Sequence, residues 1–194
     1  SSGADIGWMR CAAAAPEDVN RADADRFAAM LAALAGCPKP SVARVQGLAL
    51  GGGVGLACAC DIAIATDDAQ FAVSEARFGI LPAVIGPYVI RAIGPRQAQR
   101  LALTAQRIGA EEALRLGLVQ HVVPASELDA AVDATLTELL ASGPQAQAEI
   151  KILFAQLRPG EVGPEAQALT AATIARVRST PEAKEGFAAF AEKR

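Results

Sequence analysis

The first long stretch with helical periodicity lies between residues 17 and 35. Apolar side chains recur there three or four positions apart, at Phe27, Leu31 and Leu34, which is the spacing of one face of a helix. A proline precedes the stretch, and Gly36 with two following prolines ends it. The pattern predicts a helix over Glu17–Ala35 with its apolar face toward the core.

Two short runs rich in β-branched residues come next, with a glycine-rich turn between them. The runs are SVARVQG at 41–47 and DIAIA at 61–65, and the turn LALGGG leads into the apolar segment VGLACAC. Strand, helix and strand at this spacing are typical of a βαβ unit, whose strands are parallel. They predict an α/β fold with a mostly parallel sheet, and a further short segment follows over 70–73.

The second half of the chain has mainly helical patterns and one brief strand, at 119–123. The expected helices are 87–93, 96–104, 111–116, 127–141 with Ser126 as its N-cap, 145–157, 165–178 and 182–193. The helix at 165–178 has a broad apolar face, which must pack either on the chain's own core or on a neighbouring subunit.

Composition excludes several classes of protein. The chain has 194 residues, 52% of them hydrophobic and 20% charged, which is typical of a globular protein. Its net charge is −3 and its 18 basic residues are scattered, so it has no basic stripe for nucleic acid. No apolar run reaches the roughly 18 residues of a membrane span. The four cysteines lack paired spacing, which favours a structural role and a reducing cytoplasm.

The three glycines Gly51–Gly53 are the first candidate for chemistry. They follow a strand and open a helix, where the amide groups have no intrahelical partner and lie at the positive end of the helix dipole. Glycine also permits a positive φ and a close approach of a ligand. The turn therefore suits a developing oxyanion, although a tight strand–helix crossing explains the same glycines. Dinucleotide binding is disfavoured because the spacing is not GxGxxG.

The opening Ser-Gly-Ala-Asp is a second turn of small residues that can present free backbone amides. Two such turns together make an oxyanion hole with two donors. Asp5 either braces this turn or is an ordinary turn aspartate.

Glu75 is the candidate proton-transfer residue. The side chains around it in the sequence are apolar apart from Arg77. Burial among such residues disfavours the charged carboxylate and makes it a credible general base. The alternative is a solvated glutamate at the start of a helix.

Four segments carry a resemblance to a known family. They are the block from Lys39 to Pro82 with its A-L-G-G-G turn, the block LTAQRIGAEEALRLGLVQHVVP, the final STPEAKEGFAAFAEKR, and the initial SGADIGWM. Their order and spacing resemble the enoyl-CoA hydratase/isomerase (crotonase) superfamily over essentially the whole chain.

The resemblance implies a fold and an assembly. The fold is α/β, with a crotonase-like ββα spiral core over residues 1–124 and a C-terminal helical region for oligomerisation over 125–194. It implies further strands before the first residue, whose absence would leave a sheet edge exposed, and a basic, aromatic tip after the last residue. The expected assembly is a homotrimer or a dimer of trimers in the cytoplasm.

The resemblance also assigns site residues. The amides of Ala4 and Gly52 correspond to the oxyanion hole, and Glu75 to the catalytic glutamate. Substrate contacts are expected at Gly51, Gly53, Gly55, Asp5, Ala83 and Tyr88. This chain departs from the family pattern at Gly55, where hydratases with two carboxylates have a second glutamate.

A finer resemblance points to the bacterial methylglutaconyl-CoA and carboxygeranoyl-CoA hydratases of leucine and acyclic-terpenoid breakdown. It rests on the combination GADIxWM, GGGVG and SExRxGxxPAxIxPYV. Substrates of that branch have a second carboxylate, for which Arg77, Arg91 and Tyr88 are the candidate partners.

The function expected from these similarities is hydration of a 2-enoyl-CoA by an oxyanion hole and a single glutamate. A 3,2-enoyl-CoA isomerase, which needs only one glutamate, is the alternative. A non-catalytic subunit kept for assembly is the alternative of another class. The substrate is an acyl-CoA of fatty-acid or leucine metabolism, and no metal or redox cofactor is implied.

Overall fold

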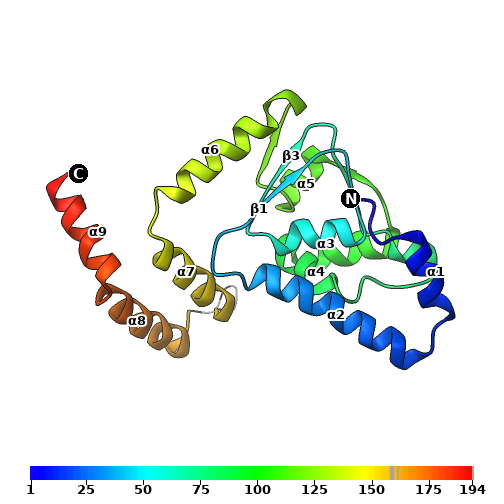
Figure 1. Ribbon diagram of the computed structural model, residues 1–194, viewed down its shortest axis with the longest axis horizontal. Helices are drawn as coiled ribbons and strands as arrows, with labels where there is room; N and C mark the ends of the chain where they lie inside the picture. Colours follow the sequence, from blue (N-terminus) through cyan, green and yellow to red (C-terminus); the bar gives the residue numbers. More distant parts are fainter. Residues whose placement is uncertain (158–159, 161, 194) are drawn as a thin grey trace. The chain divides into compact units, whose positions relative to one another are not determined.

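The computed structural model describes residues 1–157, 160 and 162–193 (Figure 1). The chain divides into two compact units. The first contains residues 1–35 and 41–134, and the second contains residues 36–40 and 135–194.

The first unit is built from repeated ββα segments. The first repeat is β1 (Val42–Val45), β2 (Leu48–Leu50) and α3 (Gly52–Ala59). The second is β3 (Ile62–Thr66), β4 (Gln70–Ala72), the 3₁₀ turn η1 (Glu75–Phe78) and α4 (Gly86–Thr104). The elements that follow are β5 (Ile108–Gly109), α5 (Ala110–Leu116) and β6 (His121–Val123).

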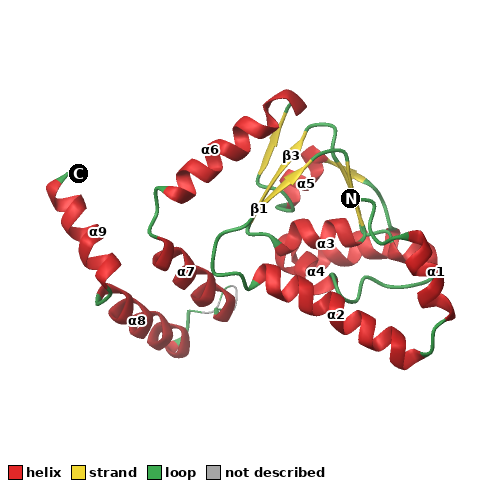
Figure 2. Ribbon diagram, viewed as in Figure 1, coloured by secondary structure: helices red, strands yellow, loops and turns green. Residues whose placement is uncertain are grey.

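Successive repeats add strands to two different sheets (Figure 2). One sheet has the order β1-β3-β6 with parallel neighbours. The other has the order β2-β4-β5, in which β2 and β4 are parallel and β4 and β5 antiparallel. Each repeat thus contributes one strand to each sheet, which gives the ββα spiral and confirms a mostly parallel arrangement.

Helix α3 is the centre of this unit and contacts α2 (Glu17–Ala35) and α4 (Figure 1). Its buried residues are nearly all small: Gly53, Val54, Gly55, Ala57, Cys58 and Ala59. Small side chains allow neighbouring backbones to come close, so α3 fits between the other elements. On α2, Leu31 is fully buried and Phe27 and Leu34 pack against the core, as their spacing predicts.

Two helices differ from the sequence prediction. Helix α1 (Ile6–Ala14) lies in a segment for which the sequence patterns predict no helix. It buries no residue, and Asp5 caps its first turn. The helices expected at 87–93 and 96–104 are joined as α4, with a break at Gly94, whose φ is 73°.

The expected N-cap at Ser126 is wrong. Ser126 lies inside a 3₁₀ turn, η2 (Ala125–Glu127), and α6 (Leu128–Leu140) begins directly after it. Pro124 is the N-cap of this turn and has an extended backbone, and no side chain caps the turn by a hydrogen bond among the described residues.

The second unit contains the end of α6 followed by α7 (Pro144–Gln156), α8 (Pro164–Arg178) and α9 (Pro181–Glu192). Arg176 of α8 forms a bidentate ion pair with Glu149 of α7, at 2.5 and 2.6 Å. Glu182 of α9 accepts hydrogen bonds from the amides of Gln145 and Ala146, at 2.9 and 2.8 Å. Both contacts join helices, and the second also caps the N-terminus of α7.

Over the described ranges, no helix has both the length and the apolar character needed to cross a membrane.

Substitution of Glu182 by alanine is expected to lower the free energy of unfolding by about 1–2 kcal/mol, the usual worth of a charged helix cap. Glu138→Ala is the control, because Glu138 is an exposed residue near the end of α6. Urea denaturation of both variants measures the effect. Equal midpoints would contradict the capping role.

Candidate active site

The glycine turn at the start of α3 lies beside the carboxyl group of Glu75. Gly51 has φ 51° and ψ −117°, and its amide donates to the carbonyl of Ala72 at 2.8 Å. This bond continues the pairing of β2 with β4, so the ends of both strands lie together. A β-carbon built on Gly51 would be 3.3 Å from Oε1 of Glu75. Because β2 pairs with β4, the carboxyl group of Glu75, which follows β4, lies beside the glycine turn that follows β2.

The first residues of the chain lie against the same turn. The amide of Leu50 donates to the carbonyl of Ser1 at 2.9 Å. A β-carbon on Gly3, whose φ is 95°, would be 3.1 Å from the carbonyl oxygen of Leu50 and 3.7 Å from the amide nitrogen of Gly52. A β-carbon on Gly53 would be only 2.7 Å from the carbonyl oxygen of Ser1. The two turns pack backbone against backbone because these positions have no side chains.

Two backbone amides remain available at this junction. Gly52 is the first residue of α3, and Ala4 directly follows Gly3. Within the described part of the chain, neither amide donates to a protein acceptor. The amide of Gly52 also lies at the positive end of α3. This junction can stabilise negative charge on a ligand oxygen.

Asp5 orients the chain as it leaves this junction. Its Oδ1 accepts a hydrogen bond from the amide of Trp8 at 2.8 Å and so caps α1. The carboxylate of Asp5 is therefore engaged in a local cap next to Ala4.

Glu75 has an unusual electrostatic environment. It is the first residue of η1 and is half-buried, and its Oε2 is fully buried without a hydrogen-bond partner among the described residues. Burial raises the pKa of the Glu75 carboxyl, and the backbone amides of Glu75 and Ser74 partly offset that rise. The carboxyl is thereby made a better proton acceptor than an exposed glutamate.

Position 55 has no room for a side chain. Gly55 is buried, and a β-carbon there would be 2.3 Å from Cγ2 of Ile85. This chain has Gly55 where the two-glutamate pattern has its second glutamate, and Ile85 fills the space of that side chain. The sequence gives no local sign of this contact, because the two residues are thirty positions apart.

The other candidate residues lie on or before α4. Ala83 is exposed in the turn that precedes the helix, and its amide donates to the carbonyl of Leu81 at 2.8 Å. Tyr88 packs partly against the core, with the guanidinium of Arg91 5.7 Å from its ring centre. Arg77 donates to the carbonyl of Ala105 at 3.2 Å.

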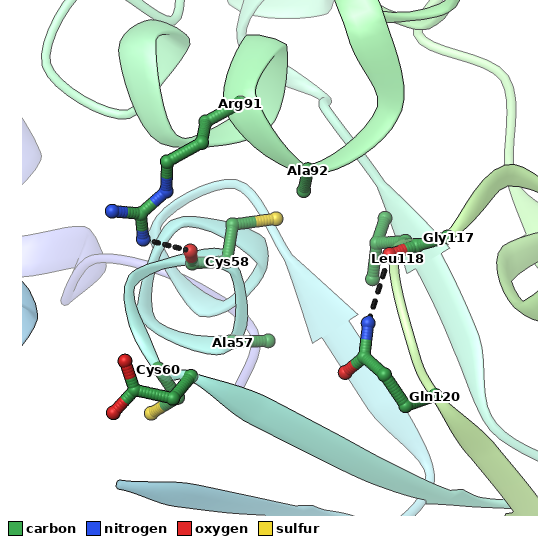
Figure 3. A pocket seen from close by; sticks show the side chains of 9 residues that line it. Ala57, Cys58, Cys60, Arg91, Ala92, Gly117, Leu118 and Gln120 are labelled. Carbon is green, nitrogen blue, oxygen red and sulfur yellow. Dashed lines mark hydrogen bonds between the residues drawn. The ribbon is translucent and has the colours of Figure 1, made fainter. Parts of the chain in front are cut away.

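Arg91 lies at the other end of α3 from the glycine turn. It donates to the carbonyl of Cys58 at 3.0 Å and borders a cavity of about 290 Å³ (Figure 3). The cavity is lined by Ala57, Cys58, Cys60, Asp61, Arg91, Ala92, Gly117, Leu118 and Gln120. The side chain of Gln120 accepts a hydrogen bond from the amide of Ala63 and donates one to the carbonyl of Gly117. The cavity does not include Glu75, so it is separate from the glycine junction.

The cysteines are not joined by disulfides. Burial raises the pKa of the Cys58 thiol to about 12, which keeps it protonated and unreactive. In the part of the chain that the structure describes, no three side chains of His, Cys, Asp or Glu are grouped to hold a metal ion.

The sequence profile of one family, described as enoyl-CoA hydratase/isomerase, matches residues 1–194. The chain belongs to this family. An enoyl-CoA hydratase from Shewanella pealeana has the same fold, with a TM-score of 0.95 and 42% identity over 100% of this chain and 72% of that one. AtuE of Pseudomonas aeruginosa gives a TM-score of 0.91 at 41% identity, over 100% of this chain and 75% of that one. The predicted crotonase-like α/β fold is confirmed.

Several sequence relatives of this enoyl-CoA hydratase/isomerase family member are named as hydratases. The crotonyl-CoA hydratase of Syntrophomonas wolfei is 34% identical over 200 residues, which cover 100% of this chain and 73% of that protein. The mitochondrial methylglutaconyl-CoA hydratase of Rattus norvegicus is 35% identical over 179 residues, 87% of this chain and 55% of that protein. The chain spans 62% of the length of a Thermus thermophilus relative that is 36% identical.

Substitution of Gly51 by alanine is expected to destabilise this family member by roughly 1–3 kcal/mol, because a side chain disfavours the backbone conformation there. The control is Gly186→Ala in the middle of α9, where nothing lies within 4 Å of an added β-carbon. That change should be stabilising by about 0.5–1 kcal/mol. Thermal melts of the two variants should shift in opposite directions. A shift in the same direction would count against the required backbone conformation at Gly51.

Proposed function

We propose that this protein adds water to the double bond of a 2-enoyl-CoA thioester. The observation that carries the proposal is the carboxyl of Glu75 beside the glycine turn, 3.3 Å from a β-carbon built on Gly51. Family membership supplies the substrate class, because the relatives from Syntrophomonas and Rattus are named as hydratases of acyl-CoA thioesters.

The thioester oxygen would lie between the amides of Ala4 and Gly52. Both amides are free of protein acceptors within the described residues, and the backbone around them is closely packed. Donors held in place before the reaction need no reorganisation as charge develops on the oxygen. Loss of one such donor typically costs about 3–4 kcal/mol of barrier.

Glu75 would transfer the proton. Its carboxylate takes a proton from water as the water oxygen forms a bond to the β-carbon of the substrate. The electron pair of the double bond moves toward the thioester, whose oxygen becomes enolate-like in the oxyanion hole. The carboxyl then returns the proton to the α-carbon, so water is added and the enzyme is regenerated. A carboxyl with a raised pKa suits both halves of this cycle.

The proposal extends to a short, branched acyl chain of the methylglutaconyl type. The Rattus relative supports it, at 35% identity. Arg77 and Arg91 are engaged with the carbonyls of Ala105 and Cys58, so neither is assigned to a second substrate carboxylate. A panel of straight, branched and dicarboxylic 2-enoyl-CoA thioesters tests the extension. Preference for the straight chains would contradict it.

A 3,2-enoyl-CoA isomerase is the second candidate, and the crowding of position 55 by Ile85 favours it. That crowding leaves Glu75 as the carboxyl beside the glycine turn among the described residues, and one carboxyl is enough to move a proton between two carbons of the substrate. Incubation with 2-enoyl-CoA and with 3-enoyl-CoA, followed by product mass, separates the two functions. Hydration adds the mass of water, whereas isomerisation leaves the mass unchanged.

Replacement of Glu75 by glutamine should lower kcat by at least about 10²–10⁴-fold, the usual contribution of a general base. The folded protein should be no less stable, because an amide removes the charge from a side chain whose Oε2 is buried without a hydrogen-bond partner among the described residues. Glu111→Gln, on the exposed first turn of α5, is the control and should retain full activity. Retained activity in Glu75→Gln would refute the assignment.

The C-terminal helices support a proposal about assembly. Helices α7, α8 and α9 bury none of their described residues. Exposed large apolar side chains on them include Ile150, Ile152, Phe154, Ile174, Phe187 and Phe190. So much exposed apolar surface is unusual for an isolated monomer. The proposed assembly is a homotrimer or a dimer of trimers that covers this surface.

Charged residues at two of these positions should disrupt the assembly. Phe187→Glu with Phe190→Glu, both on α9, is expected to lower the native mass measured by light scattering. Leu103→Glu is the control, since Leu103 is equally exposed but belongs to the first unit. An unchanged native mass in the double variant would exclude α9 from the interface.

A further inference from the structure

The short turn that contains Glu75 is not held in place by buried side chains. Turn η1 buries none of its four residues. Its backbone hydrogen bonds among the described residues are local, from the amides of Arg77, Gly79 and Ile80 to carbonyls of residues 74–76. Such bonds shape the turn but do not fix its place on the protein, so its position depends on contacts with other elements.

Arg77 makes a contact of this kind. Its Nε donates a hydrogen bond at 3.2 Å to the carbonyl of Ala105, 28 positions further along the chain. Ala105 is 3% exposed and is the C-cap of α4. Carbonyl groups at the end of a helix lack intrahelical partners and lie at the negative end of the helix dipole, so they favour a guanidinium donor. Arg77 therefore ties η1 to the buried end of α4.

The acceptor of this bond leads into the strand that pairs with β4. Ala105 lies just before β5, and Ile108 of β5 is the partner of Phe71 of β4. The chain thus forms a closed path from β4 through η1, across the Arg77 bond to the end of α4, and back to β4 through β5. Glu75 lies on this path between its two fixed points, the strand pairing and the Arg77 bond.

The carboxyl of Glu75 is not held by any other side chain among the described residues. Its Oε2 is buried without a hydrogen-bond partner there. The groups that stabilise its charged form are the backbone amides of Glu75 and Ser74, which belong to the turn or directly precede it. The place of the carboxyl beside Gly51 is therefore set by the place of η1, and a displaced turn would move the carboxyl with it.

We propose that Arg77 is a positioning residue for the Glu75 carboxyl. By holding η1 on the buried carbonyl of Ala105, it keeps the carboxyl beside the glycine turn, where the proton is transferred. Arg77 acts through Glu75 and needs no contact with the substrate. This inference rests on the proposed role of Glu75 as the base.

Removal of the bond is tested by steady-state kinetics of hydration. Arg77→Ala should lower kcat by roughly 10–100-fold, since a misplacement of about 1 Å is enough for such a loss. KM should change little, because the amides of Ala4 and Gly52 stay in place. Arg77→Lys keeps a cation that can donate to the same carbonyl and should recover most of the lost kcat. An unchanged kcat in Arg77→Ala, or an effect on KM alone, would overturn the proposal.

Arg100→Ala is the matched control. Arg100 also lies near the end of α4, and it donates to Gln97, Gln106 and Glu112 at 2.8, 3.4 and 2.7 Å but to no described residue of η1. Its truncation should lower the melting temperature and leave kcat unchanged. An equal fall of kcat in Arg100→Ala would show that general loosening of α4 explains the loss, and would overturn the role of Arg77.

A double variant tests whether Arg77 acts through the carboxyl. If it does, the losses do not multiply, and Glu75→Gln combined with Arg77→Ala should be as active as Glu75→Gln alone. Losses that multiply would mean that Arg77 supports activity by another route, which contradicts the inference. An active Glu75→Gln enzyme refutes the proposed base instead, so the two claims fail in different ways.

Discussion

The close approach of three backbone segments at the start of α3 is the constraint on which the rest of this structure depends. The chain's first residues, the glycine turn and the loop that ends β4 meet there, and a side chain at Gly3, Gly51 or Gly53 would contact backbone or the Glu75 carboxyl at 3.3 Å or less. Two of these glycines also have a positive φ, which a side chain disfavours. The same lack of side chains lets Gly3, which precedes Ala4, pack 3.7 Å, measured from an added β-carbon, from the amide nitrogen of Gly52. The fold and the proposed chemistry thus both depend on the same glycines.

Two electrostatic effects on negative charge oppose each other at this junction. The start of α3 and its amides attract negative charge, whereas burial of Glu75 disfavours the charged form of its carboxyl. Oε2 of Glu75 is buried and has no hydrogen-bond partner in the part of the chain that the structure describes. Such a group reduces stability, and folded proteins retain such groups where they serve a function. The proposed addition of water to the double bond of an enoyl thioester requires donors that stabilise an enolate-like oxygen and a carboxyl that takes up a proton.

Local signals were enough for much of the fold and part of the site. Helical spacing predicted α2 and its core face, and the three glycines between two β-branched runs predicted the start of α3. Strand β2 was missed, because its residues lie in the segment interpreted as the turn. Apolar neighbours made burial of Glu75 one of two interpretations, with a solvated glutamate as the other, and the structure has Glu75 half-buried with its Oε2 fully buried. Helix α1 was not predictable in this way, because it buries nothing and depends on the Asp5 cap. The contact between Gly55 and Ile85 also has no local pattern, since it depends on how α4 packs on α3.

The most direct test of the central claim is a crystal structure of the protein with a 3-hydroxyacyl-CoA, the product of hydration. The thioester oxygen should lie about 2.7–3.1 Å from the amide nitrogens of both Ala4 and Gly52. The carboxyl of Glu75 should lie within hydrogen-bonding distance of the 3-hydroxyl group. A thioester oxygen bound away from these two amides, with Glu75 out of reach of the acyl chain, would contradict the account.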